Sequence, residues 1–520
     1  MFKPELNWFL AAFLAVFLAV LGAHPATAQP QAAVEQPCGD IDTALSRATS
    51  FGPIDLTTVR QFYEAFGHGC AWNEDSALGL IEVLRAAGDH GLEPSLFHAE
   101  ALYWPQNLVT PDKAAERDVV LSDAALKYAI ILSRGLSSDP ALALDQAADF
   151  RPNGELIDGL IGALYQGSIG EWLRSLAPRY DAYIRLQAAL IDYRAVAQAG
   201  GWGQLPLSLA NSKRRSKSFA QLRTRLALEG DLAMDSGSAK FDEALRQALA
   251  RFQLRNGMRS DGELTAKTIE RLNISVGERI AVMALNLERL RVSLRDMPAT
   301  RVEVNAPAAT AVLFRNGAPH LRMNVVVGAP KHETPELSST IDSIVVNPPW
   351  TIPASIVRNE IKPLLRRNRN YLIQNRMYWS GDQLVQEPGP QNALGRIKFD
   401  FPNRYSVYLH DTPSRKLFTD PERAASHGCV RLERPLELAV ELLTGSTDWN
   451  REEIEQAIRA GETRRIGLDN PMPVVITYQT AFVDDGGLVH FRTDIYGRDT
   501  GLTLRLAERA GALKAEPAQW

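Results

Sequence analysis

The most diagnostic stretch of this 520-residue chain reads SHGCVR and runs from Ser426 to Arg431. It contains Cys429, and the upstream motif YLHDT (residues 408–412) contributes His410. A thiol is a strong nucleophile only as the thiolate, and a free cysteine with a pKa of ~8.5 is mostly protonated at neutral pH. A nearby base or positive charge must therefore activate it, and the two motifs supply histidines, an arginine and a small glycine beside the sulfur. Together they predict acyl transfer through a thioester.

The overall composition is that of a globular protein with several domains. A chain of 520 residues is too long for one ordinary domain, and about three are expected. Lys and Arg number 57 against 61 Asp and Glu, which gives a formal net charge of -4. Nucleic-acid-binding proteins usually carry a basic excess, so no nucleic-acid partner is expected.

The first 28 residues are typical of a signal peptide. Lys3 precedes an apolar run from Trp8 to Leu21, and the sequence ATA at residues 26–28 fits a cleavage site made of small residues. The run is shorter than the about 20 apolar residues that span a bilayer comfortably, and an uncleaved inner-membrane anchor is the alternative. The sequence therefore predicts export to the periplasm.

The three cysteines of the chain are Cys38, Cys70 and Cys429. Export places them in an oxidising compartment, where an odd number leaves one thiol unpaired. Cys38 and Cys70 lie near each other in the sequence, so we expect them to form a disulfide and Cys429 to stay free. The alternative is that all three thiols are unpaired.

The N-terminal half of the chain is predicted to be helical. Residues 29–45 are rich in Ala, Gln and Pro, which indicates a linker. From residue 46 to residue 230 apolar side chains recur at helical spacing, as Leu80, Val83 and Leu84 do. This region therefore reads as a helical scaffold domain, and it shows no catalytic constellation.

Residues 237–275 form a compact unit of two helices. The sequence FQLRNG (residues 252–257) ends the first helix, SDGEL (residues 260–264) makes a turn, and the second helix runs from Thr265 to Leu272. This pattern resembles the peptidoglycan-binding repeat of cell-wall enzymes, in which Phe-Gln, Gly, Asp-Gly, Thr and Leu-Asn follow one another. A small helical spacer without ligand affinity is the alternative.

The period of the apolar residues changes after Met297. Segments such as residues 321–327 and 341–346 have the composition of strands. Further strands are expected near residues 395–399, 406–410, 474–478 and 488–493, with helices near residues 434–443 and 451–460. The sequence thus predicts a mostly β catalytic domain over residues 300–480, followed by a C-terminal strand and tail over residues 481–520.

The order of the two reactive residues narrows the class of thiol enzyme. Papain-like and NlpC-type enzymes place the cysteine before the histidine, whereas here His410 precedes Cys429. This order, together with SHGCVR, resembles the YkuD-type L,D-transpeptidase catalytic domain. The motifs VVNPPW (residues 345–350), PGPQNALGR (residues 388–396) and TDIY (residues 493–496) are similar to the large YcbB-like subfamily of that family.

The resemblance implies a multidomain α+β protein. That subfamily joins a helical scaffold, a helical peptidoglycan-binding-like domain and a mostly β YkuD-type catalytic domain with a capping insertion, in the order predicted here. Residues 351–394 would be the capping lid. Its interleaved basic and aromatic residues could hold the carboxylates of stem peptides, or they could form a solvated helix face with the aromatic rings packed inward.

The resemblance also assigns roles within the two motifs. His410 is expected to be the general base for Cys429, with the backbone carbonyl of Asp411 orienting its ring. Backbone N–H groups around Gly428 and Cys429 would form an oxyanion hole. His427 is a rival base or a neighbour that steers substrate. Arg431 either stabilises charge near the thiolate or forms a structural salt bridge.

The implied reaction joins two peptidoglycan stem peptides. The thiolate attacks the carbonyl of the third residue of a tetrapeptide donor, D-alanine leaves, and the side-chain amine of a diamino acid in another stem resolves the thioester as a 3→3 cross-link. Such a wall-associated enzyme would serve cell-wall organisation and cell shape.

Three alternatives stay open for the function. Water as the acceptor would give an L,D-carboxypeptidase, and an outer-membrane protein as the acceptor would be attached to the wall. A non-catalytic wall-binding scaffold is the alternative from a different class. No cofactor and no metal is expected, because His-Glu-x-x-His is absent and the pair His332-Glu333 lacks a second histidine.

Overall fold

The fold is described here from a computed structural model of the chain. The described residues are 38–47, 55–99, 102, 110–136, 153–211, 216–233, 238–293, 297–444 and 448–513. The predicted signal peptide (residues 1–28) lies outside them. Among the described helices, none is long and apolar enough to cross a membrane.

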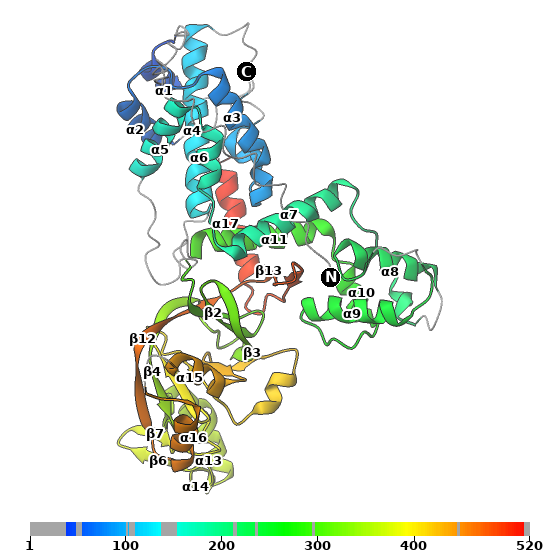
Figure 1. Cartoon of the computed structure of the whole chain (residues 1–520), viewed down its shortest axis with the longest axis vertical. Helices are drawn as coiled ribbons and strands as arrows, with labels where there is room; N and C mark the ends of the chain where they lie inside the picture. The colour runs from blue at the N-terminus through cyan, green and yellow to red at the C-terminus, as the bar shows by residue number, and fades with distance from the viewer. Residues whose placement is uncertain are drawn as a thin grey trace, which may run out of the picture.

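The molecule has three regions (Figure 1). A helical bundle lies at one end of the long axis, a β-rich region lies at the other end, and a small helical unit projects to the side between them. The arrangement is the predicted multidomain α+β fold, with the helical regions first and the mostly β region after them.

The helical bundle is built around one long central helix. Its helices are α1 (Ile41–Arg47), α2 (Leu56–Phe66), α3 (Glu74–Arg85), α4 (Pro111–Arg134), α5 (Asn153–Gln166) and α6 (Ile169–Ser175). Helix α4 begins with Pro111 behind the N-cap Thr110, a favourable start because proline lacks only an N–H that would be unpaired there. Its side chains are buried on nearly every side, so the other helices pack around it.

The predicted disulfide between Cys38 and Cys70 is present and Cys429 is the free cysteine. The chain after Cys70 is held by the buried carboxylate of Asp118, which accepts hydrogen bonds from the backbone N–H groups of Ala71 and Trp72, both at 2.9 Å. The linker prediction for residues 29–45 is wrong at its C-terminal end. Helix α1 begins at Ile41 inside it, because the apolar residues of this helix are buried in the bundle core.

The side unit contains α8 (Lys217–Leu228), α9 (Glu243–Arg255) and α10 (Ala266–Leu272), and it is flanked by α7 (Asp181–Gln198) and α11 (Val276–Ser293). Gln253 explains its Phe-Gln and Asp-Gly signature. The amide nitrogen of this buried side chain donates to the Glu263 carbonyl at 2.8 Å, and its oxygen accepts from the Gly262 N–H at 2.7 Å. One glutamine thus fixes the turn between α9 and α10.

The β-rich region is built on a nine-stranded sheet in the order β10-β3-β11-β9-β8-β4-β12-β1-β2. Strand β2 also pairs with β3, so the sheet closes on itself. The strands are β1 (Arg301–Asn305), β2 (Thr310–Arg315), β3 (Ala318–Gly328), β4 (Leu337–Val346), β8 (Ile397–Asp400), β9 (Leu409–His410), β10 (Ala424–Ser426), β11 (Val430–Leu432) and β12 (Arg464–Thr477). Helices α15 (Pro435–Leu443) and α16 (Arg451–Ala460) complete its apolar core.

The chain between β4 and β8 forms a small subdomain. It contains β5 (Trp350–Thr351), α12 (Ala354–Ile356), a π-helical turn η6 (Val357–Ile361), α13 (Lys362–Arg367), α14 (Tyr371–Gln374), β6 (Met377–Ser380) and β7 (Gln383–Gln386). A three-stranded sheet and a separate apolar core that includes Ile356 and Leu384 hold it together. Tyr371 packs against this core, whereas Tyr378 and Trp379 are exposed, so the aromatic rings do not all point inward.

The C-terminal segment is more ordered than the predicted strand and tail over residues 481–520. Strands β13 (Ala481–Val483) and β14 (Val489–Phe491) form a hairpin, and α17 (Arg498–Leu513) follows. Figure 1 shows α17 running back toward the helical bundle. The reason is an apolar stripe, in which Leu502 and Leu506 are four residues apart and pack with Val292 of α11.

Candidate active site

The nucleophile and the predicted base come from neighbouring parallel strands. Strand β11 pairs with β9 so that Arg431 lies opposite His410. The Val430 N–H donates to the Tyr408 carbonyl at 3.1 Å and fixes this register. Because paired residues of neighbouring strands share a face, His410 and Arg431 lie on the same face of the sheet. Tyr408 directly precedes β9 and Cys429 directly precedes β11.

A backbone carbonyl fixes the orientation of the His410 ring. The imidazole is 4% exposed, and its Nδ1 lies 2.5 Å from the carbonyl oxygen of Asp411, the contact expected of an orienting carbonyl. The buried Asp411 is itself fixed, because its carboxylate pairs with Arg415 at 2.6 Å and accepts from the Arg396 N–H at 2.8 Å. The backbone of Leu394 also makes a hydrogen bond with the imidazole. In the neutral ring that carries its proton on Nδ1, Nε2 is the nitrogen that can accept a proton.

The electrostatic environment of the site favours the neutral forms of His410 and Cys429. Burial, aided by the charge of Arg431, lowers the pKa of His410 to about 3. Burial also raises the pKa of the Cys429 thiol, although hydrogen bonds from Tyr408 and the charges of Lys398 and Arg431 oppose this. The resting pair is therefore a thiol and a neutral imidazole, which suits a general base better than a preformed ion pair.

Comparison with known families matches three regions of the chain. Residues 299–457 match the family model described as the YkuD "L,D-transpeptidase catalytic domain". The chain carries a YkuD-type L,D-transpeptidase catalytic domain. Upstream of this L,D-transpeptidase domain, residues 57–190 match a "Scaffold domain" and residues 215–272 match a "Putative peptidoglycan binding domain".

One curated protein and several solved structures are similar to this chain. A "Putative L,D-transpeptidase" of Haemophilus influenzae is 25% identical over 462 residues, which cover 83% of this chain and 84% of that protein. The solved L,D-transpeptidase from Mycobacterium smegmatis is 13% identical with a TM-score of 0.19, and the match covers 34% of this chain and 57% of that one. That of Xylanimonas cellulosilytica is 15% identical with a TM-score of 0.16 and coverages of 53% and 98%.

Tyr408 is a site residue of the transpeptidase domain that the sequence analysis did not single out. Its phenol makes a hydrogen bond with the Cys429 thiol and lowers the pKa of the sulfur. The ammonium of Lys398 lies 4.3 Å from the centre of the Tyr408 ring. The available signal was its position, because Tyr408 stands two residues before His410 on a predicted strand and must share its face.

The loop before Cys429 uses one of the two backbone N–H groups predicted for the oxyanion hole. Gly428 has a φ of +109°, a backbone conformation that favours glycine. Its N–H donates to the Ser426 hydroxyl at 3.1 Å, and its carbonyl accepts from the Thr334 hydroxyl at 2.8 Å. Since the Gly428 N–H is used inside the loop, the Cys429 N–H is the better candidate to meet an oxyanion.

The contacts of His427 and Arg431 bear on the roles expected of them. The Nε2 of His427 lies 2.6 Å from a carboxylate oxygen of Glu360 in the insertion, so this nitrogen is engaged away from the thiol. The His332 ring lies beside that of His427 at a tilt, with centroids 4.7 Å apart. Arg431 forms no ion pair with any described residue, and its buried Nε has no hydrogen-bond partner there. This disfavours a structural salt bridge and favours a role near the sulfur.

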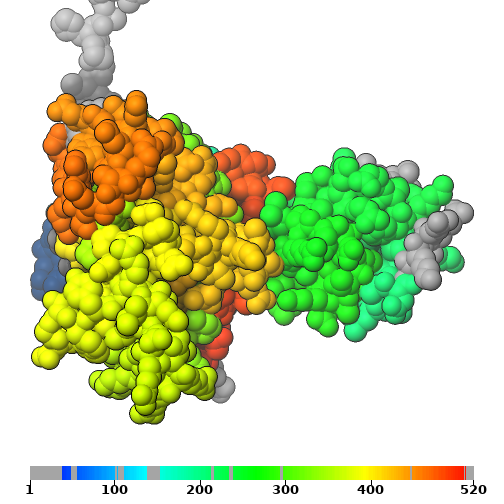
Figure 2. Space-filling model, turned by 90° about the horizontal axis from the view of Figure 1, so that it is seen from below, coloured from blue at the N-terminus to red at the C-terminus, as the bar shows by residue number. Residues whose placement is uncertain are grey.

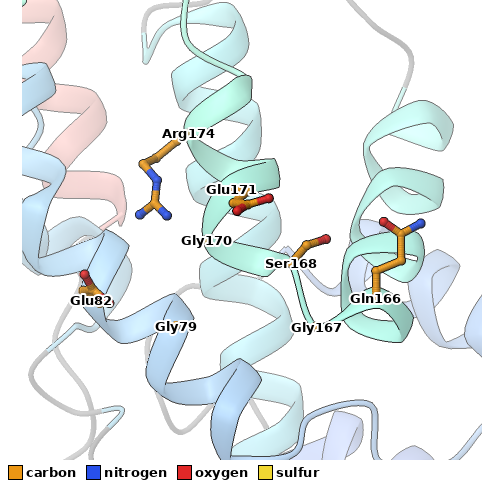
Figure 3. Close-up of a pocket in the computed structure, with 8 residues that line it drawn as sticks. All are labelled: Gly79, Glu82, Gln166, Gly167, Ser168, Gly170, Glu171 and Arg174. Carbon is orange, nitrogen blue, oxygen red and sulfur yellow. The ribbon is translucent and has the colours of Figure 1, made fainter. Parts of the chain in front are cut away.

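The described residues contain no cluster of three or more His, Cys, Asp or Glu side chains that could hold a metal ion. A cavity of about 380 Å³ lies far from Cys429, between α3 and the turn that joins α5 to α6 (Figure 3). Glu82, Glu171 and Arg174 line it. Ser168 also lines this cavity, but no histidine, lysine or cysteine does.

Proposed function

We propose that this protein is a periplasmic L,D-transpeptidase of the YcbB-like type that makes 3→3 cross-links through a thioester on Cys429. The observation that carries the proposal is the pairing of β9 with β11 inside a YkuD-type domain, which sets His410 opposite Arg431, two residues after Cys429. The order of scaffold, wall-binding and catalytic regions supports the subtype.

The first half of the reaction forms the acyl-enzyme. His410 Nε2 accepts the Cys429 proton as the sulfur attacks the carbonyl carbon of the third stem residue. The oxyanion that forms is stabilised by the Cys429 N–H and by the nearby charge of Arg431. The carbon–nitrogen bond to D-alanine then breaks, and the imidazolium returns its proton to the leaving amine.

The second half transfers the acyl group. The side-chain amine of a diamino acid attacks the thioester carbon, and the sulfur leaves as thiolate. His410 accepts the surplus proton of the amine and passes it to the sulfur, so the resting thiol and neutral imidazole are regenerated. Because both states of the histidine are used in each half, a pKa that is low in the free enzyme must rise as the thiolate forms beside it.

The remaining regions would hold the substrate. The unit at residues 215–272 would bind the wall polymer, and the insertion between β4 and β8 lies next to the catalytic loop through the contact between His427 and Glu360. Water as the acceptor gives an L,D-carboxypeptidase, and an outer-membrane protein as the acceptor gives attachment to the wall. Both use the same acyl-enzyme.

The test uses disaccharide-tetrapeptides and the purified protein, with products analysed by mass spectrometry. Loss of D-alanine together with the mass of a cross-linked dimer supports transpeptidation, and tripeptide monomer alone would assign the carboxypeptidase. Cys429→Ala should abolish both products, and an acyl-enzyme mass should appear on the wild-type protein only. Unchanged turnover in Cys429→Ala would refute the mechanism.

A further inference from the structure

The insertion between β4 and β8 exposes cations that lack acidic partners among the described residues. They are Arg358, Lys362, Arg366, Arg367 and Arg369, all exposed and none in an ion pair there. Residues 351–394 hold six Lys or Arg and three Asp or Glu, whereas the whole chain has a net charge of -4. Two of those acids are already occupied, because Glu360 pairs with His427 and Glu387 pairs with Arg376.

The helix of the insertion separates three of these cations from the catalytic loop. Arg358, Lys362 and Arg366 follow one another at intervals of four residues, close to one helical turn, so they share one stripe. Glu360 stands two residues from Arg358 and from Lys362, hence on the opposite side of the helix, where it meets His427. Like charges at this spacing destabilise a helix by a few tenths of a kcal/mol per pair. A stripe that is unfavourable for folding and turned away from Cys429 indicates an anionic partner other than the reacting stem.

Exposed apolar side chains lie beside the cations. Ile373 of α14 is 79% exposed, and Tyr378 and Trp379 of β6 are 48% and 49% exposed. Leu364 of α13 is 37% exposed. Helix α14 contacts both α13 and β6, so these elements are neighbours. We call the five cations and these four side chains the cationic face.

The cationic face lies at an end of the molecule. In Figure 1, α13, α14 and β6 are at the far end of the long axis from the helical bundle. Figure 2 views the molecule from that end, and the insertion, in yellow-green, faces the viewer without being covered by the side unit. A broad, flat partner could therefore reach this face without meeting the rest of the protein.

We propose that the cationic face docks on an anionic phospholipid surface. Lys and Arg beside an anionic membrane each contribute about a factor of five to binding, and Trp and Tyr are the aromatic residues enriched at the headgroup level. A protruding isoleucine and leucine add to this, since aliphatic side chains enter the boundary of the acyl chains but recognise neither sugars nor carboxylates. The combination fits a lipid surface better than a free stem peptide.

Vesicle sedimentation tests the proposal on the chain that starts after residue 28. The probes are vesicles of phosphatidylcholine alone and of phosphatidylcholine with one third phosphatidylglycerol. The wild-type protein should bind the second kind and release as salt rises. Lys362→Glu/Arg366→Glu should weaken this binding about 30-fold or more. The matched control, Arg259→Glu/Lys267→Glu, reverses two exposed charges of the side unit and should bind as the wild type does.

Two further measurements separate the outcomes. Ile373→Ser/Trp379→Ser should weaken binding without altering its salt dependence, and circular dichroism should show every variant folded. Cys429→Ala should bind vesicles normally, because docking does not depend on acyl transfer. Equal sedimentation with both lipids, or equal loss in the control variant, overturns the proposal. So does a Lys362→Glu/Arg366→Glu protein that keeps vesicle binding but loses binding to isolated peptidoglycan sacculi.

Discussion

The folded protein should become less stable at mildly acidic pH, because His410 is held neutral in the folded state. The side chain is buried, and burial together with Arg431 lowers its pKa from the usual 6.5 to about 3. The unfolded chain therefore takes up a proton near pH 6.5 that the folded chain takes up only near pH 3. Stability falls as the pH drops through this window, because the unfolded state binds more protons there.

The size of the effect follows from the two pKa values. One pKa unit corresponds to about 1.4 kcal/mol. From about pH 7.5 to about pH 5, His410 alone should lower the free energy of unfolding by about 2 kcal/mol. Replacing it by glutamine removes the titration, while the glutamine amide can still donate to the Asp411 carbonyl.

Urea unfolding followed by circular dichroism measures this at both pH values. The wild-type protein should lose about 2 kcal/mol more than His410→Gln between them. Other buried histidines, such as His90, titrate in both proteins and cancel. An equal loss in His410→Gln and the wild type would mean that His410 is not held neutral, and the argument for a general base would fail with it.

Three more substitutions test other parts of the structure. Cys38→Ser opens a bridge between residues 32 apart and should lower the free energy of unfolding by about 3–4 kcal/mol in urea, whereas an unchanged midpoint would contradict this. Gly395 has a φ of +64°, and the Cβ of Gly395→Ala would clash with the Asp411 carboxyl, so this variant should release less D-alanine and melt at a lower temperature. Gly381→Ala is the control, because Gly381 has a φ of +59° but no atom lies within 4 Å of the added Cβ. It should cost only the backbone strain of about 1–2 kcal/mol. Glu360→Gln breaks the exposed pair with His427, which is worth at most about 1 kcal/mol, so the melting temperature should not fall. The KM for tetrapeptide should rise, because the pair joins the insertion to the catalytic loop. An unchanged KM would count against a substrate role for the insertion.

The parts of the site that could be predicted from the sequence are those fixed by local pattern. Cys429 and His410 were identified from the motifs around them and from their order along the chain. The disulfide followed from counting cysteines. The turn between α9 and α10 followed from its Asp-Gly and Phe-Gln pairs, because Gln253 makes those contacts within ten residues of chain.

The parts that could not be predicted depend on contacts between distant residues. Glu360 and His427 are 67 residues apart, and neither position has a pattern that names its partner. The engagement of the Gly428 N–H by Ser426 depends on the exact bend of the loop. Helix α17 was missed because its apolar stripe is narrow and interrupted by charges, and its partners lie on α11 rather than nearby in the sequence.

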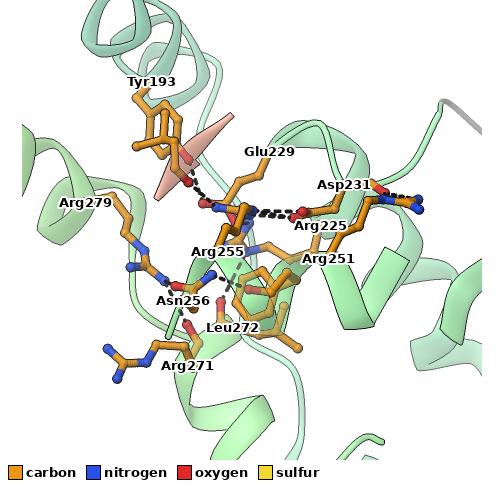
Figure 4. A network of polar contacts seen from close by, with 12 residues as sticks. Tyr193, Arg225, Glu229, Asp231, Arg251, Arg255, Asn256, Arg271, Leu272 and Arg279 are labelled. Atoms are coloured by element: carbon orange, nitrogen blue, oxygen red, sulfur yellow. Dashed lines mark hydrogen bonds and ion pairs between the residues drawn. The ribbon is translucent and has the colours of Figure 1, made fainter. Parts of the chain in front are cut away.

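Buried arginines connect the side unit with the β13–β14 hairpin. The usual expectation that charged side chains are exposed does not predict such contacts. Arg255 ends α9, pairs with Glu229 at 2.6 Å and donates to the Val489 carbonyl of the β13–β14 hairpin at 3.0 Å (Figure 4). Arg492 of the same segment donates back to the Arg255 carbonyl at 2.6 Å. Breaking a buried pair of this kind costs about 3–5 kcal/mol, because the remaining charge is left without a partner. The hairpin directly follows β12 of the catalytic sheet, so these contacts tie the matched wall-binding unit to the domain that holds Cys429. A polymer held by the side unit would then meet the catalytic face in a fixed orientation, which a flexible tether between the two could not provide.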